Sequence, residues 1–149
     1  HPKENASVED LTSAMDLVMI DSPCTGVGTW RRKPDAKWRV TPSALEKRMQ
    51  DQAMILRTAC NYVKPGGRLV YVTCSFLMEE NEDQIASFLA DRNDFKPEDA
   101  AEAAIKSGQL TETGAKLVRK CRRPDGSVRL TPRTAGTDGF YMAVMRRAG

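Results

Sequence analysis

Apolar residues form two short, continuous runs in the first half of the chain. Residues 16–21 (DLVMID) and 68–74 (RLVYVTC) show little alternation of polar and apolar positions, which is typical of strands covered on both faces in a parallel sheet. Between them, apolar residues recur at helical intervals over about 43–63, and Ser43 stands three positions before Glu46, as in a capping box. The pattern therefore predicts a strand, a helix and a second strand.

A second helical pattern follows at residues 79–92 (EENEDQIASFLADR). Its first turn is predicted to hold acidic residues, which the helix dipole favours there: Glu79, Glu80, Glu82 and Asp83. Residues 97–117 are only weakly periodic, PDGS at 124–127 predicts a turn, and 139–147 predicts a last strand. The order strand, helix, strand, helix predicts a right-handed βαβ unit and the fold class α/β.

The length of 149 residues suits one domain or part of one. No apolar run approaches the roughly 20 residues that a membrane helix needs, so no membrane partner is expected. Residues 1–15 lack the pattern of a secretory signal, so a cytoplasmic location is the default expectation.

The net charge is uninformative about binding partners, but the distribution of charged residues along the chain is informative. The net charge is +3, but Lys and Arg concentrate at residues 31–39 and 116–133, whereas 79–102 is acidic. A local basic surface is what a polyanion-binding face requires, although a solvated charged surface has the same composition.

The four cysteines contain no C-x-x-C pair, which argues against a zinc ribbon, a thioredoxin-type site and a disulfide scaffold. Cys24 and Cys74 each follow a predicted strand, and parallel neighbours end at the same edge of a sheet, where ligands bind in open α/β folds. A site with two thiols and Asp21 is therefore predicted at this edge. Packing roles and a disulfide are the alternatives, and packing is preferred for Cys60 and Cys121.

Five segments resemble, in order and spacing, the Sun/nucleolar-protein family of RNA cytosine-5 methyltransferases, which use S-adenosylmethionine. They are DSPCTGVG (21–28), RRKPDAKWR (31–39), KPGGRLVYVTCS (64–75), ENE (80–82) and LTPRTAGTDGFYMA (130–143). The resemblance implies a Rossmann-like class I methyltransferase sheet, incomplete, with later strands and helices only. Residues 1–149 would then be the carboxyl-terminal part of one catalytic domain, with 95–127 as a variable insertion.

The resemblance also implies roles for individual residues. Cys74 would be the nucleophile that adds to cytosine C6, and Cys24 would assist breakdown of the covalent adduct. DNA cytosine-5 methyltransferases use the Pro-Cys thiol instead, but the Thr-Cys-Ser motif favours Cys74. Asp21 would lie at the cofactor and the target base, with a helix N-cap as its alternative role. Pro23 would shape the turn that presents Cys24 to the base and, with Asp21, would bind the cofactor.

RNA, and ribosomal RNA in particular, is the partner that the resemblance implies. A base must leave its stack to reach such a pocket, which suits single-stranded RNA. The residues expected to contact RNA are Arg31, Arg32, Lys33, Lys37 and Arg39, with Lys33 standing where the family often has His. Trp30 and Trp38 would either stack on bases or anchor the loop. A monomer without metal is expected.

The glycine-rich loop that cradles the cofactor in class I methyltransferases does not occur upstream of Asp16. The main S-adenosylmethionine loop is therefore expected outside this chain, which alone would be inactive. The alternative is a truncated, non-catalytic methyltransferase-like module that binds RNA. A thiol-dependent hydrolase is disfavoured, because His1 is the only histidine.

Overall fold

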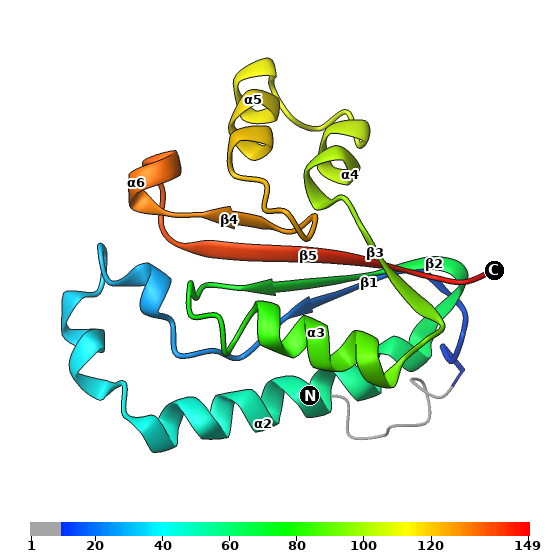
Figure 1. The fold of residues 1–149 in the computed structure, drawn as a ribbon, viewed down its shortest axis with the longest axis horizontal. Coiled ribbons are helices and arrows are strands. Elements are labelled where there is room, and N and C mark those ends of the chain that lie inside the picture. The colour runs from blue at the N-terminus through cyan, green and yellow to red at the C-terminus, as the bar shows by residue number, and fades with distance from the viewer. Residues whose placement is uncertain (1–9) are drawn as a thin grey trace.

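The computed structural model describes residues 10–149, so the polar start of the chain and His1 lie outside the described residues. The predicted strand–helix–strand unit is present as β1 (Met15–Asp21), α2 (Pro42–Ala59) and β2 (Val63–Thr73) (Figure 1). The two strands pair in parallel, with Asp21 opposite Val72, so their carboxyl ends lie side by side as predicted.

The remaining helices and strands complete a mixed sheet of five strands. They are α3 (Glu82–Asp91), β3 (Phe95–Glu98), α4 (Ala100–Lys106), α5 (Glu112–Lys120), β4 (Val128–Leu130), α6 (Pro132–Ala135) and β5 (Phe140–Arg147), with short 3-10 helices η1 (Val27–Thr29), η2 (Pro34–Arg39) and η3 (Cys60–Tyr62). The strand order is β1-β2-β5-β3, and β4 also pairs with β5. β5 runs antiparallel to its neighbours, so only the β1–β2 pair follows the predicted parallel arrangement.

The sheet separates two layers of helices, with α2 and α3 on one face and α4 and α5 on the other (Figure 1). The larger core lies under α2 and α3, where Leu56, Tyr71 and Phe88 are buried. Cys60 belongs to this core, and Cys121 belongs to a smaller core beneath α4 and α5. Both thiols are therefore packed away from the edge that carries Cys24 and Cys74.

Three local predictions were wrong. Within residues 10–149, β1 is covered on one face only, because Ile20 is buried whereas Leu17 and Met19, on the opposite face, are 54% and 63% exposed. The N-cap of α2 is Thr41, whose hydroxyl accepts from the amide of Ala44, with Pro42 as the first helical residue. α3 begins at Glu82, so Glu79 and Glu80 precede the helix.

The segment 95–127 is built into the fold. β3 pairs with β5, and Phe95 packs edge-to-face on Phe88 at a ring distance of 5.3 Å. The turn predicted at 124–127 is present, since Arg122 and Val128 on either side of it form an antiparallel bridge. In the 10–149 region no helix is long and apolar enough to cross a membrane.

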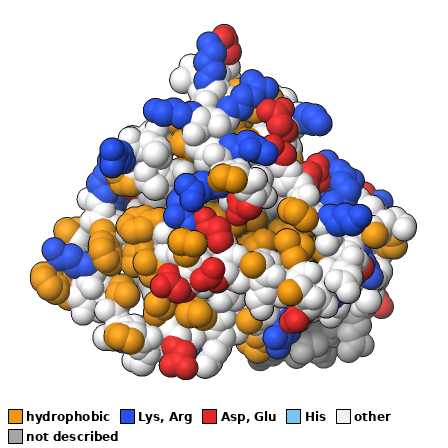
Figure 2. Space-filling view, in the orientation of Figure 1, with side chains coloured by type: hydrophobic (Ala, Val, Ile, Leu, Met, Phe, Trp, Pro, Cys, Tyr) orange, Lys and Arg blue, Asp and Glu red, His pale blue; other side chains and the backbone are white. Residues whose placement is uncertain are grey.

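The basic run at 116–133 is largely paired with acids. Arg119 pairs with Glu102, and Arg122 with Asp99. Figure 2 shows Lys and Arg side chains interspersed with Asp and Glu at the α4–α5 end of the molecule. This face is therefore of mixed charge, as a solvated surface would be.

Candidate active site

The two thiols that follow β1 and β2 meet at the sheet edge. Cys24 lies three residues beyond Asp21, Cys74 directly follows Thr73, and their Sγ atoms are 3.3 Å apart. Both cysteines are free and half-buried. Cys24 and Cys74 were predicted to meet where β1 and β2 end, and they do so although they are fifty residues apart in sequence.

The contact makes the two thiols unequal. The hydrogen bond from Cys24 lowers the pKa of Cys74 from its ordinary 9.0 to about 7, although burial and the carboxylates of Asp21 and Glu80 oppose this change. The same hydrogen bond, together with burial, raises the pKa of Cys24. These opposite pKa shifts favour Cys74 as the thiol that ionises first.

Two glycines join the thiol-bearing turns to the Asp-Gly-Phe segment. The amide of Gly28 donates to the Cys74 carbonyl at 3.0 Å, and the amide of Gly139 donates to the Gly28 carbonyl at 2.8 Å. A Cβ on Gly28 would lie 2.3 Å from the Gly139 oxygen. Three motifs distant in sequence therefore meet at one backbone junction that admits only glycine.

The Cys74 turn is held by a buried network of its own. The Thr73 hydroxyl donates to the Asn81 side-chain oxygen at 2.6 Å, and the Asn81 side-chain amide donates to the Ser75 carbonyl at 3.1 Å. The amide of Ser75 donates back to the Thr73 hydroxyl at 3.2 Å. This network accounts for the Thr-Cys-Ser spacing, because the residues on both sides of Cys74 are fixed.

Asp21, the last residue of β1, and Pro23 lie just before Cys24 in the chain, outside the lining of the thiol cavity. Asp21 is exposed at the end of β1, and its carboxylate is close enough to raise the pKa of Cys74. The helices that follow within the described chain are capped by Gly26, Lys33 and Thr41, so Asp21 is not an N-cap there. The carbonyl of Pro23 accepts from the Gln52 side chain at 2.9 Å.

A cavity of about 430 Å³ opens at the thiols. Its lining comprises Cys24, Thr25, Gly26, Thr29, Lys33, Ala36, Arg39, Val40, Ala44, Arg48 and Cys74. Two of the five predicted RNA contacts, Lys33 and Arg39, thus reach the cavity. Arg48 of α2, which is half-buried, was missed from the sequence because a single Arg within a helical pattern carries no distinguishing signal.

The other predicted contacts have different neighbours. Arg31 and Arg32 both pair with the buried carboxylate of Asp138 in the Asp-Gly-Phe segment. The Lys37 ammonium lies over the Trp38 ring at 4.6 Å, and Trp38 is 80% exposed. Trp30 is half-buried with its ring N–H enclosed. Trp38 is thus placed to stack, whereas Trp30 is placed to anchor the loop.

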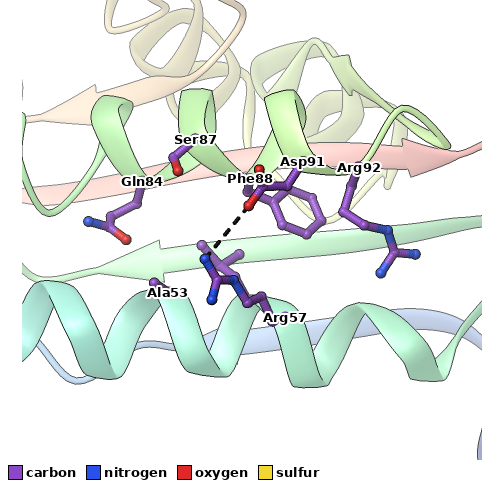
Figure 3. A pocket seen from close by; sticks show the side chains of 8 residues that line it. Ala53, Arg57, Gln84, Ser87, Phe88, Asp91 and Arg92 are labelled. Atoms are coloured by element: carbon purple, nitrogen blue, oxygen red, sulfur yellow. Dashed lines mark ion pairs between the residues drawn. The ribbon is translucent and has the colours of Figure 1, made fainter.

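A second cavity of about 220 Å³ lies between α2 and α3 (Figure 3). Arg57 of α2 points toward Asp91 of α3, and the two form an ion pair at 3.7 Å. None of the side chains that line it is a cysteine. Within residues 10–149, no cluster of three or more His, Cys, Asp or Glu side chains is arranged to hold a metal.

Comparison with known proteins identifies the family. A model of the family described as 16S rRNA methyltransferase RsmB/F matches residues 3–146. The chain belongs to this family. The resemblance seen in the motifs is thereby confirmed, as is the class of fold.

Curated relatives in the RsmB/F family are much longer than this chain. A probable ribosomal RNA small subunit methyltransferase B of Bacillus subtilis (strain 168) is 37% identical over 134 residues, which cover 90% of this chain and 28% of that protein. The ribosomal RNA small subunit methyltransferase B of Shewanella oneidensis is 35% identical over 133 residues, 89% of this chain and 27% of that protein. The chain thus spans little more than a quarter of these relatives.

Solved structures agree with this assignment. The crystal structure of PH0851 superposes with a TM-score of 0.73 at 32% identity, over 91% of this chain and 27% of that one. The crystal structure of NSun6 from Pyrococcus horikoshii with SFG has a TM-score of 0.64 at 24% identity, over 88% and 29% of the two chains. The second likeness shows the fold alone.

Proposed function

We propose that a protein containing this chain methylates C5 of a cytosine in ribosomal RNA through a covalent adduct between Cys74 and C6. The observation that carries the proposal is the 3.3 Å contact of the two thiols, together with the lowered pKa of Cys74. Family membership supports ribosomal RNA as the substrate. C5 is chosen because methylation at this carbon first requires a nucleophile to add at C6, and a site with two thiols can supply one.

The chemistry uses the unequal thiols in two steps. The Cys74 thiolate attacks C6, which makes C5 electron-rich enough to take a methyl group. Later C5 loses its proton to water, and the S–C6 bond breaks to release Cys74 as a thiolate. A low thiol pKa favours departure, so the Cys24 S–H assists the release by hydrogen bonding to the Cys74 sulfur.

S-adenosylmethionine would supply the methyl group, but the chain offers only part of a site for it. Asp21 is exposed beside Cys74, and Pro23 shapes the same turn, so these two residues fit one side of a cofactor. We propose that residues 1–149 form the carboxyl-terminal part of a catalytic domain and that the glycine-rich loop lies outside them.

RNA would enter through the basic wall of the thiol cavity. Lys33, Arg39 and Arg48 line it together with the two cysteines, and they can neutralise the phosphates that flank an extruded base. The exposed Trp38 ring adds a surface for stacking. Single-stranded RNA in the cytoplasm is the proposed substrate.

The test separates the roles of the two thiols in a full-length enzyme that contains this chain. We expect Cys74→Ala to abolish methylation, and Cys24→Ala to leave the enzyme joined to RNA as an adduct that survives denaturing electrophoresis. Cys121→Ala is the control, because that thiol is buried in the smaller core. An adduct in Cys74→Ala instead of Cys24→Ala would reverse the assignment.

A non-catalytic RNA-binding module is the second candidate, favoured by the incomplete cofactor site. Both functions predict that the 149-residue chain alone binds S-adenosylmethionine weakly or not at all. Calorimetric titration of the chain checks this expectation, and micromolar affinity would contradict it. Methylation by the full-length protein then decides between the two candidates.

A further inference from the structure

Glu80 is a fully buried acid that the proposed chemistry does not use. Its side chain is 0% exposed, and within the described residues it takes part in no ion pair. Both oxygens instead accept hydrogen bonds from neutral groups. Burying a carboxylate raises the free energy of the folded state unless the carboxylate accepts hydrogen bonds, so these hydrogen bonds are expected to be maintained.

The donors to Glu80 are the residues around Cys24. Thr25 donates twice, from its amide to Oε1 at 2.7 Å and from its hydroxyl to Oε2 at 2.6 Å. Gln52 of α2 donates to Oε1 at 3.2 Å and also to the Pro23 carbonyl at 2.9 Å. Thr25, after Cys24, is thus bonded directly to Glu80, and Pro23, before Cys24, is bonded to it through Gln52.

The segment that holds Glu80 is also hydrogen-bonded to β2 and to the turn that carries Cys74. The Tyr71 hydroxyl of β2 donates to the Glu80 carbonyl at 2.7 Å, three residues before Cys74. Asn81, the next residue, bonds Thr73 and Ser75 on either side of Cys74. One dipeptide therefore contacts both thiol-bearing turns, with Glu80 facing the first and Asn81 the second.

We propose that Glu80 and Asn81 act as a clamp that sets the distance between the two thiols, with Glu80 as the positioning residue for Cys24. The catalytic role of this clamp rests on the proposed function, because Glu80 would act through Cys24 and not on the RNA base or the cofactor. The clamp explains why a buried acid lies in the turn before α3, outside the first helical turn where the dipole would act on it.

Thr25→Val is the sharpest variant, because it removes the hydroxyl donor and leaves every charge in place. Gln52→Met removes the amide donor at similar volume, so that a folding failure in one variant leaves the other informative. Glu80→Gln keeps the size and removes the charge. Thr58→Val on the exposed face of α2 and Glu79→Gln on the exposed residue next to Glu80 are the matched controls.

The first readout is the pH dependence of the reaction of Cys74 with iodoacetamide in the full-length enzyme, followed by peptide mass spectrometry. The groups that face Cys74 are Cys24, Asp21, Glu80 and the cavity cations Lys33, Arg39 and Arg48. If Cys24 is released, Cys74 loses its hydrogen bond, and the reaction at neutral pH slows by about tenfold in Thr25→Val and Gln52→Met.

Glu80→Gln separates position from charge. Removing a negative charge near Cys74 favours the thiolate, so a purely electrostatic Glu80 would make the reaction faster. A slower reaction is the expected result of lost positioning. An unchanged profile in both Thr25→Val and Gln52→Met, or a faster reaction in Glu80→Gln, would overturn the clamp.

The second readout is the RNA adduct in the full-length enzyme. Thr25→Val and Glu80→Gln should accumulate adduct as Cys24→Ala does, whereas a partly unfolded enzyme would form less adduct. If the alkylation profile shifts but neither these variants nor Cys24→Ala yields adduct, the clamp stands and the proposed chemistry fails. If Cys24→Ala alone accumulates adduct, the chemistry stands and the clamp fails.

Discussion

The edge that carries the thiols and the α4–α5 segment are stabilised in different ways. At the thiol edge, three backbone segments contact each other through Gly28 and Gly139, and buried polar groups bond one another directly. The α4–α5 segment is held by a small apolar core and by ion pairs at the surface, such as Arg119 with Glu102.

The difference indicates where substitutions should matter. Close backbone contacts and buried hydrogen bonds leave little room for adjustment, whereas exposed ion pairs contribute little and tolerate replacement. Substitutions at the thiol edge are therefore expected to cost several times more stability than substitutions of comparable size in α4 and α5.

Gly28→Ala should have the largest effect. The new Cβ would lie 2.3 Å from the Gly139 oxygen and 2.8 Å from the Cys74 oxygen, and both are backbone atoms. Separating these segments should lower the free energy of unfolding by about 3 kcal/mol, as measured by urea denaturation of the chain.

Gly114→Ala in α5 is the matched control for this substitution. Its Cβ would lie 3.3 Å from the Thr111 hydroxyl and at ordinary contact distance from the Leu110 side chain. Since alanine also favours a helix, the change should stay below about 1 kcal/mol. Equal losses in the two variants would mean that the thiol edge is no tighter than the α4–α5 segment.

Periodicity and strand-end position predicted the parts of the fold that depend on local pattern. The apolar runs gave β1 and β2, and the rule that parallel strands end at one edge brought Cys24 to Cys74. The motifs also identified the family correctly. The assignment of roles to the individual thiols remains a prediction that the Cys24→Ala and Cys74→Ala variants test.

Contacts between distant polar residues could not be predicted in this way. Glu80 was expected in the first turn of the helix because its charge suggests a dipole role, yet it lies before the helix and is buried. Gln52 carried a weak signal, since it is a polar residue spaced three after Met49 and four before Leu56, on the apolar stripe of α2. Its partner could be found only from the tertiary fold.

Asp99→Ala should have an intermediate effect on stability. Asp99 belongs to the α4–α5 segment, where substitutions are expected to cost less than at the thiol edge. The Asp99 side chain caps α4 by accepting from the amide of Glu102 at 3.0 Å, and it also pairs with Arg122. Loss of the cap should cost about 1 kcal/mol of unfolding free energy. A cost equal to that of Gly28→Ala would remove the contrast between the two regions.

The same carboxylate predicts a pH dependence. The Glu102 amide, followed by Arg122, lowers the pKa of Asp99 below its ordinary 3.8, although burial opposes the change. A lowered folded pKa means that the stabilisation is present above pH 3.8 and is lost as the pH falls through the folded pKa. Asp99→Asn keeps a cap acceptor and should lose this dependence, as urea denaturation over acidic pH would show.

Lys116→Gln should have the smallest effect. The Lys116 ammonium and the Glu112 carboxylate form an exposed pair at 2.6 Å, four residues apart on α5 with the acid on the N-terminal side. Such pairs stabilise a helix by about 0.3 kcal/mol at low salt. Because salt screens exposed charges, the loss measured by urea denaturation should vanish in roughly 1 M salt. A loss that persists in high salt would show that α5 depends on Lys116 for more than charge, and that the α4–α5 segment shares the intolerance of the thiol edge.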